Sequence, residues 1–290
     1  MPAGKGHRLN GVVRALEETP AAFTTFSSPG IENAVNLSFT KYDGVVYELE
    51  HNPYDIKDLQ LSLQFMLHRQ QIHDAPTVAP AVAPMVRIPP NGGENAQWFA
   101  KQVLDLGAYG VIWPQITTVQ DAYNAVAACR YPAKKTSSYY EPRGLRGDAA
   151  TNAARYWGLS RDEYYQRCDV WPLNPDGELV VVTMCESMEA LGNLKEVLAE
   201  VPGIGVVLVG EADLTHDMGI PQQYDNKEFK DALREIGEIC KNAGVVAGHP
   251  HVFKQNVENL LELGYRFLMT RPASTYDGLD EGHRLTSRQG

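Results

Sequence analysis

Acidic side chains follow three short apolar segments of this chain, at positions where packing alone does not call for them. Glu48 and His51 follow the apolar run 45–47, Glu186 follows 180–185, and Asp213 follows 204–210. In a barrel of alternating strands and helices, the C-terminal strand ends build the active site. The sequence therefore predicts carboxylates and one histidine gathered at one face of such a barrel.

Two of these carboxylates have the spacing of a metal site. Glu186 and Asp213 end consecutive predicted strands, and neighbouring strands lie about 5 Å apart. Two carboxylates there can share one divalent cation and leave coordination positions for water and substrate, which suits Mg²⁺ or a similar ion. The alternative is that each carboxylate only caps the helix that follows it.

Arg87 and His51 are the other candidate functional side chains. Arg87 ends an apolar run, and its planar guanidinium matches a carboxylate; a salt bridge with Glu50 or another acid is the alternative. His51 lies among acids and could act as a general base, or it is a polar loop residue. His249 and His251 form an H-x-H pair, for which a structural role fits better than metal binding.

The elements that must position these residues alternate regularly. Several apolar runs lack strict alternation, as is typical of strands covered on both faces, and glycines at 107, 244 and 264 mark helix ends. The pattern predicts a single-domain (β/α)8 TIM barrel over 1–290. The predicted strands are 22–27, 44–49, 83–88, 109–114, 178–185, 204–210, 244–248 and 265–270. The predicted helices are 31–41, 54–68, 95–107, 118–130, 187–200, 226–243 and 253–264.

Two stretches break this rhythm. Residues 131–177 form a long excursion between the fourth and fifth strands, rich in Tyr and Trp. We expect its base at the catalytic face, where it is either a lid over the substrate or a subunit contact. Residues 276–290 are predicted to be a C-terminal outer helix and tail, which could be exchanged between subunits.

Composition limits the class of protein. The 290 residues suit one barrel of this type, and the formal charge of −10 argues against a nucleic-acid partner. No apolar run approaches the ~20 residues of a membrane helix, and the N-terminus lacks a secretion signal. The four cysteines have no CxxC spacing and are expected to be reduced. We expect a cytoplasmic enzyme without membrane or nucleic-acid partners.

At this point the motifs resemble a known family, the HpcH/HpaI aldolases. These are metal-dependent class II pyruvate aldolases of the phosphoenolpyruvate/pyruvate barrel superfamily. The resemblance extends from about Tyr42 to Leu285, and its strength lies in the joint order of the motifs. They are Tyr42-Asp43-Gly44, Leu49-Glu50-His51, Val86-Arg87, Leu104-Asp105-Leu106-Gly107-Ala108, Ala128-Cys129-Arg130-Tyr131-Pro132, Arg143-Gly144-Leu145-Arg146-Gly147, Glu186-Ser187-Met188-Glu189-Ala190-Leu191 and Ala212-Asp213-Leu214.

The resemblance implies how pyruvate and the metal are held. Glu186 and Asp213 would bind the cation, with Mg²⁺ expected first and Mn²⁺, Co²⁺ or Zn²⁺ as alternatives. Arg87 would bind the keto acid and stabilise its enolate. The backbone around Ala212 and Asp213 would receive the pyruvate carboxylate.

The resemblance also implies proton-transfer and assembly roles. His51 would work in an acid–base relay with a water, supported by Glu48 in the position of a family Asp. Asp105 would lie near the neighbouring subunit's site, on the catalytic face. A homo-oligomer is expected, with a hexamer suggested by the family.

Three departures bear on the substrate. Glu48 replaces an Asp and lengthens the relay by one methylene. Glu211 replaces a Pro and adds an acid beside the metal, whereas Met184 replaces a Gln and removes a polar partner.

The expected reaction is reversible cleavage of a 4-hydroxy-2-oxo acid to pyruvate and an aldehyde, through a metal-stabilised pyruvate enolate. One alternative is a related lyase on a CoA thioester, for which the basic residues of 131–147 are scattered, or an oxaloacetate-type decarboxylase. Another is a non-catalytic ligand-binding barrel. The sequence does not name the aldehyde, although the aromatic excursion favours a larger acceptor.

Overall fold

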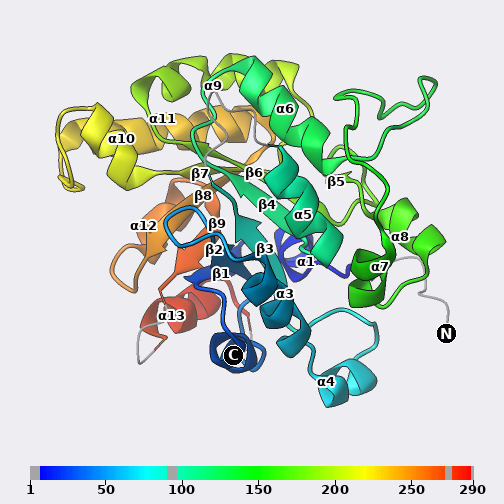
Figure 1. The fold of residues 1–290 in the computed structure, drawn as a ribbon. Helices are drawn as coiled ribbons and strands as arrows, with labels where there is room; N and C mark the ends of the chain where they lie inside the picture. Colours follow the sequence, from blue (N-terminus) through cyan, green and yellow to red (C-terminus); the bar gives the residue numbers. More distant parts are fainter. Residues whose placement is uncertain (1–6, 90–96, 272–275, 289–290) are drawn as a thin grey trace.

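Eight parallel strands close into a barrel in the computed structural model, which describes residues 7–89, 97–271 and 276–288. The strands are β1 (Ala22–Ser27), β2 (Gly44–Glu48), β3 (Ala83–Arg87), β4 (Gly110–Trp113), β6 (Leu179–Cys185), β7 (Val206–Val209), β8 (Val246–Val252) and β9 (Tyr265–Thr270). Their order is β4-β3-β2-β1-β9-β8-β7-β6, and pairing of β4 with β6 closes the barrel. The predicted TIM barrel is confirmed, and helices surround the strands in Figure 1.

Helices occupy every interval in which the sequence predicted one, and each ends at its predicted residue or up to four residues earlier. They include α2 (Ile31–Leu37), α3 (Ile56–Phe65), α5 (Trp98–Leu106), α6 (Val119–Cys129), α9 (Met188–Glu200), α11 (Lys227–Ala243) and α12 (Val257–Glu262). The first residues of the helix predicted over 95–107 lie outside the described residues. Further helices not predicted are α1 (Gly11–Glu18), α4 (Arg69–Asp74), α7 (Thr151–Trp157), α8 (Arg161–Arg167) and α10 (Glu211–Asp217).

Side chains from the strands fill the interior of the barrel. Val46, Met85 and Phe267 point inward, whereas Val45 and Val86 point outward beneath the helices, as the two-residue period of a strand requires. The helix α1 packs its apolar face, including Val12 and Val13, into the inner cluster. It therefore closes the end of the barrel at which the strands begin.

The excursion 131–177 starts at that same closed end, so its predicted position at the catalytic face is wrong. The helix α6 intervenes after β4 and carries the chain back along the barrel before the excursion begins. Arg167 donates to the carbonyl of His7 at 2.7 Å, and the short β5 (Val170–Trp171) pairs with the first residues of β6. In Figure 1, α7 and α8 lie at the right of the barrel and α10 at the left.

The excursion is ordered by buried cations rather than being a structureless loop. The buried Arg130 donates to Asp169 Oδ1 at 2.6 Å and to the carbonyls of Tyr139 and Pro142 at 2.5 and 2.7 Å. Such hydrogen bonds to a charged group inside the protein stabilise a segment strongly. Trp157 packs nearby and donates to the carbonyl of Gly107 at 2.8 Å.

The C-terminal helix α13 (Asp277–Leu285) covers the barrel next to β1, where an outer helix was predicted. Its Gly282 lies against Phe23, and the His283 ring meets Phe23 edge to face at 5.2 Å. Arg288 then pairs with Asp43 at 2.6 Å. The helix thus packs on its own barrel, and its exchange between subunits stays a prediction.

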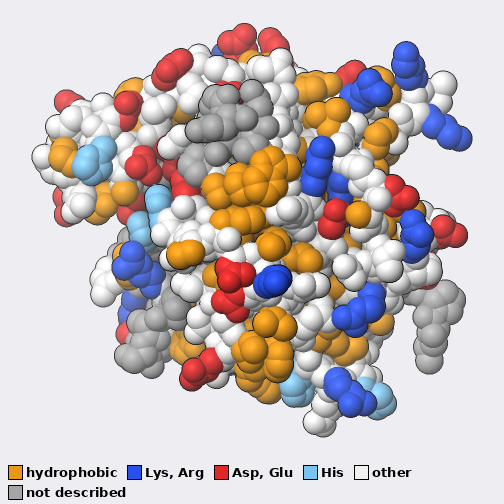
Figure 2. All heavy atoms as spheres, in the orientation of Figure 1, with side chains coloured by type: hydrophobic (Ala, Val, Ile, Leu, Met, Phe, Trp, Pro, Cys, Tyr) orange, Lys and Arg blue, Asp and Glu red, His pale blue; other side chains and the backbone are white. Residues whose placement is uncertain are grey.

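The surface carries an apolar area over two neighbouring helices. We call it the α2–α3 patch, and its exposed side chains are Ile31, Val35, Phe39, Leu61 and Phe65. Figure 2 shows apolar side chains gathered below the centre of this face, around α3. None of the described helices is both long enough and apolar enough to span a bilayer.

Candidate active site

The predicted metal ligands and cationic side chain meet at the open, C-terminal end of the barrel. Glu48 and Arg87 end β2 and β3 and are partners in the sheet. Glu186 directly follows β6, and Asp213 lies two residues after the start of α10, which follows β7. The strand ends deliver these residues because all eight strands run in the same direction.

Arg87 is fixed by two carboxylates and an aromatic ring. Its Nε donates to Glu48 Oε2 at 2.7 Å, and its Nη1 lies 2.9 Å from Glu50 Oε2. The guanidinium stacks over Phe26 at 4.7 Å, and Nη1 contacts the Met184 sulfur at 3.9 Å. The ion-pair alternative for Arg87 is therefore present in this structure. The same contacts hold the guanidinium plane at the barrel mouth, where a substrate carboxylate or keto oxygen could exchange with the acids.

Glu48 supports the turn after β2 rather than the ring of His51. Its Oε1 accepts the backbone N–H groups of Glu50 at 2.7 Å and of His51 at 3.1 Å. The His51 side chain is 68% exposed, with Nε2 3.6 Å from Glu50 Oε2. The relay proposed for His51 stays a prediction, and Glu48 contributes to it here only through the backbone.

Glu186 is held by backbone on two sides. Its Oε2 accepts the N–H of Gln115 at 2.6 Å, and Gln115 has a φ of 55°, a left-handed conformation that is costly for a residue with a Cβ. On the other side, a Cβ at Gly210 would overlap the Glu186 carboxyl. Gln115 and Gly210 therefore fix this side chain, and neither could be identified from its side-chain type.

Asp213 and Ala212 lie in the first turn of α10, and both are exposed. Backbone N–H groups in a first helical turn have no partner within the helix, so they are available to an oxygen ligand. Asp213 lines a cavity of about 380 Å³ together with Glu186, Gln115 and Ser187. The proposed roles of Ala212 and Asp213 stay predictions, but the structure brings Asp213 and Glu186 to one cavity.

Crowded negative charge distinguishes this end of the barrel. Burial raises the pKa of Glu186 to about 7, and the charges of Glu50 and Asp213 add to the shift. Burial also raises the pKa of Glu50 to about 7; Arg87 opposes this shift, and Glu48 and Asp213 increase it. The buried Glu50 Oε2 has the ion pair with Arg87 at 2.9 Å as its close contact. These carboxylates repel one another, and a cation would relieve that repulsion.

The donor set fits a divalent cation with few protein ligands. In the described part of the chain, no group of three or more His, Cys, Asp and Glu residues is arranged to hold a metal ion. Glu186 and Asp213 nevertheless supply oxygen donors to one cavity, with excess negative charge around them. Hard cations such as Mg²⁺ prefer oxygen ligands and keep several waters.

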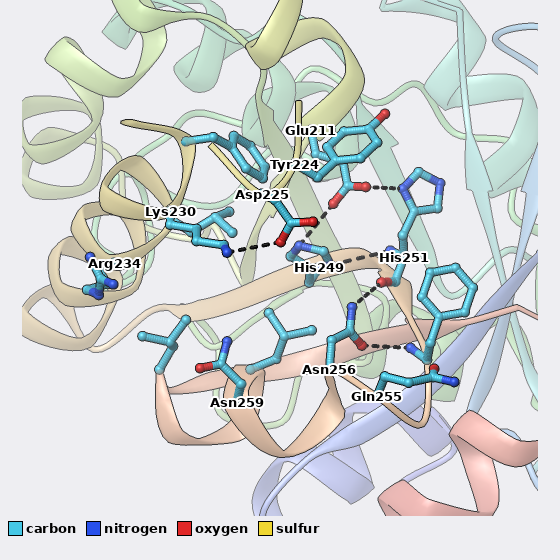
Figure 3. A pocket seen from close by; sticks show the side chains of 15 residues that line it. Glu211, Tyr224, Asp225, Lys230, Arg234, His249, His251, Gln255, Asn256 and Asn259 are labelled. Carbon is cyan, nitrogen blue, oxygen red and sulfur yellow. Dashed lines mark hydrogen bonds and ion pairs between the residues drawn. The ribbon is translucent and has the colours of Figure 1, made fainter. Parts of the chain in front are cut away.

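Glu211 does not face the predicted metal ligands, so the expectation that it adds an acid beside the metal is not met. Its Oε2 lies 3.0 Å from His249 Nε2 and its Oε1 2.6 Å from His251 Nδ1 (Figure 3). Burial alone would raise the pKa of Glu211, but hydrogen bonds from both histidines and their charge lower it to about 2. His249 and His251 thus hold an ionised carboxylate.

Asp105 lies far from the catalytic face of its own barrel, and the prediction of that face for it is wrong. It is near the C-terminal end of α5, which runs back from the open end towards the closed end. There Asp105 Oδ1 accepts from Arg146 Nη2 at 2.9 Å. Burial raises its pKa, and Arg146 opposes the shift. Its contribution to a neighbouring subunit stays a prediction.

Known proteins resemble this chain in sequence and in fold. The model of the HpcH/HpaI aldolase/citrate lyase family matches residues 27–270. A 4-hydroxy-2-oxovalerate aldolase of Rhodococcus jostii is 31% identical over 207 residues, covering 71% of this chain and 67% of the relative. A 2-keto-3-deoxy-L-rhamnonate aldolase of Escherichia coli is 32% identical over 218 residues, covering 74% of this chain and 70% of the relative. A crystal structure of a protein of this family from Burkholderia cenocepacia superposes with a TM-score of 0.73 at 25% identity, covering 95% of this chain and 97% of the other.

Proposed function

Since the chain belongs to the HpcH/HpaI aldolase/citrate lyase family and is a carbon–carbon lyase, we propose that it reversibly cleaves a 4-hydroxy-2-oxo acid to pyruvate and an aldehyde. The observation that carries the proposal is that Glu186 and Asp213 line one cavity at the open end of the barrel, where the charges of Asp213 and Arg87 both act on Glu186. Relatives named as aldolases for different 2-oxo acids support the substrate class.

Arg87 would bind the 2-oxo acid end of the substrate. Its guanidinium lies over the Phe26 ring and already accommodates carboxylate oxygens at 2.7 and 2.9 Å. A substrate oxygen that replaces one of these carboxylates would accept hydrogen bonds from the same guanidinium N–H groups. As the C3–C4 bond breaks, negative charge develops on the keto oxygen, and a fixed cation beside it lowers the barrier.

Glu186 and Asp213 would hold a divalent cation, for which we propose Mg²⁺ before Mn²⁺, Co²⁺ or Zn²⁺. When bound, such an ion supplies positive charge that polarises the keto group. The Gln115 N–H and the space at Gly210 keep the Glu186 carboxyl oriented toward the cavity. For His51 we propose a relay with water that returns a proton to the carbon left after cleavage.

Binding of oxalate, an enolate mimic, tests the site directly. Titration by calorimetry with and without Mg²⁺ should show binding only when the cation is present. The activity itself is tested by measuring pyruvate release from a panel of 4-hydroxy-2-oxo acids. Release of pyruvate from oxaloacetate alone would favour a decarboxylase, and release of an acyl-CoA product would favour a thioester lyase. Absence of all three reactions, together with metal-independent binding, would favour a non-catalytic barrel.

We also propose a cytoplasmic homo-oligomer, with a hexamer expected from the family. The α2–α3 patch supports association because exposed apolar side chains gather there on neighbouring helices. Light scattering of the purified chain measures its mass in solution. A fully active species of 32 kDa would contradict the proposal.

A further inference from the structure

The carboxylate of Glu211 joins two histidines from one strand. His249 and His251 both lie on β8, and each ring contacts a different oxygen of Glu211, at 3.0 and 2.6 Å. Figure 3 shows the carboxylate between the two imidazoles. A histidine oriented by a carboxylate, which is itself oriented by a third group, is the arrangement of many catalytic bases.

His249 is the third group, because both of its ring nitrogens are occupied. Its Nε2 contacts Glu211, and its Nδ1 accepts the backbone N–H of His251 at 3.4 Å. The ring is buried and meets Tyr265 edge to face at 5.8 Å. Because both ring nitrogens are engaged inside the protein, His249 positions Glu211 and has no nitrogen left for proton exchange with a substrate.

His251 differs because one of its nitrogens has no described partner. Its Nδ1 contacts Glu211, so the hydrogen is assigned to Nδ1. Nε2 then carries a lone pair that points away from the carboxylate and can accept a proton. The side chain is 28% exposed. It lines a cavity of about 260 Å³, together with Thr25, Phe26, Pro250, Thr270 and Arg271.

This cavity borders the proposed pyruvate site. Phe26, which lines it, also carries the Arg87 guanidinium on its ring at 4.7 Å. A 2-oxo acid bound to Arg87 would have this cavity beside it, with space for its remaining carbons next to His251. The charged and titratable groups nearest His251 are Glu211, His249 and Arg271. A second cavity on its other side is lined by Tyr224, Asp225, Lys230 and Arg234 (Figure 3).

We propose that His251 is a catalytic acid–base residue for the aldehyde half of the substrate and that Glu211 positions it. The inference rests on the proposed aldolase function. In cleavage, Nε2 takes the proton of the 4-hydroxyl, the O–H electrons form the aldehyde C=O, and the C3–C4 electrons pass to the pyruvate enolate. In the reverse direction, the His251 imidazolium returns this proton to the alkoxide.

The proposal separates His251 from His51. The His51 side chain is 68% exposed, and its Nε2 lies 3.6 Å from Glu50, compared with 2.6 Å between His251 and Glu211. No described carboxylate therefore orients His51 as closely as Glu211 orients His251. Two proton transfers are needed in each turnover, one at the 4-hydroxyl and one at the enolate carbon. Two histidines, one in the turn after β2 and one on β8, can serve them separately.

The test compares two reactions in the same full-length variants. Deuterium exchange at the pyruvate methyl reports enolate chemistry, whereas pyruvate release from a 4-hydroxy-2-oxo acid also needs proton transfer at the hydroxyl. For His251→Asn, the ratio of cleavage to exchange should fall about 10²-fold, as expected for loss of a general base. Glu211→Gln should lower the ratio less and shift the acidic limb of the cleavage pH profile. His216→Asn, on the exposed side of α10, is the matched control and should leave the ratio unchanged.

An equal loss of both reactions in His251→Asn would make His251 structural, and an unchanged ratio would remove it from catalysis; either overturns the proposal. His251→Gln and the Glu211 variant give the same readout if the Asn variant does not fold, as judged by circular dichroism. A wild-type enzyme that catalyses neither exchange nor cleavage would instead refute the aldolase function.

Discussion

At the scale of single residues, Arg87 is the side chain of the site whose replacement is the most restricted. Its contacts with Glu48, Glu50 and the Phe26 ring use both its planar edge and its face. Lysine would keep the charge but lose both the fork and the stacking surface. The function of Arg87 therefore depends on its shape as well as its charge.

For Arg87→Lys we expect kcat/KM for pyruvate release to fall about 10²-fold or more, on the order of 3 kcal/mol, because a main stabiliser of the developing enolate is lost. Steady-state kinetics on the preferred hydroxy-oxo acid measure it. Arg284→Lys on the exposed side of α13 serves as the control. Near-wild-type kinetics for the Arg87 variant would show that the residue is only a structural partner.

The raised pKa values of Glu50 and Glu186 predict how stability changes with pH. Both are about 7, above the ordinary 4.5, so the folded state holds protons more tightly than the unfolded chain. Their contribution is fully present below pH 4.5 and is lost as the pH rises through 7. In EDTA, these groups should lower the free energy of unfolding by roughly 1–3 kcal/mol across this window.

A divalent cation should reverse this trend, because it binds the ionised carboxylates. Urea denaturation at pH 5 and pH 8, in EDTA and in Mn²⁺, measures both effects. Glu186→Gln should remove its own share of the pH dependence, leaving that of Glu50, and should abolish the cation effect. Equal stabilisation by Mn²⁺ at both pH values would argue against a site built from these acids.

The sequence predicts which side chains belong to the site better than it predicts the contacts that those side chains make. Arg87 and Glu186 were found because an ionic residue after an apolar run is a visible signal. Gln115 acts through its backbone N–H, to which its side-chain type gives no clue. The contact of Glu211 with His251 spans forty residues and depends on how the ends of β7 and β8 are placed.

At the scale of elements, the turn from β7 into α10 sets the Glu186 carboxyl. For Gly210→Ala we expect the barrel to form but the carboxyl to be displaced, because the added Cβ would occupy its space. Affinity for Mn²⁺ should fall at least about tenfold, since metal sites tolerate little displacement of a ligand. Calorimetric titration measures it, with Gly219→Asn as a control at a left-handed glycine that has open space around it. Unchanged affinity would mean that Glu186 does not need this glycine.

The excursion 131–177 gives a second prediction at this scale. Because it lies at the closed end of its own barrel, deleting 134–141 should leave the preference among aldehydes unchanged. The deletion removes the Tyr139 carbonyl bonded to Arg130, so a lower melting temperature is expected. An aldehyde screen and thermal denaturation separate the two effects. A changed aldehyde profile in an intact oligomer would show that the excursion reaches an active site after all.

The elements themselves were predictable to different degrees. Strands such as β6 were located closely, because runs buried on both faces leave a clear apolar signal. The excursion was misplaced because the prediction followed β4 and overlooked that α6 carries the chain back to the other end. The helix α1 is short, and its stability comes from the barrel interior into which Val12 and Val13 insert, which is tertiary information.

At the scale of the whole molecule, the barrel is closed at one end by α1 and filled by inward side chains among the described residues. Substrates and products must then enter and leave the active site through the open, C-terminal end of the barrel. If the oxo-acid end of the substrate is bound to Arg87 and the aldehyde end faces the mouth, the two products must leave in a fixed order. The aldehyde departs first and pyruvate last, and in synthesis pyruvate must arrive before its acceptor. Product inhibition of cleavage tests this order of release. Pyruvate should be a competitive inhibitor against the hydroxy-oxo acid, and the aldehyde a mixed inhibitor. Competitive inhibition by the aldehyde would mean that the order of release is reversed.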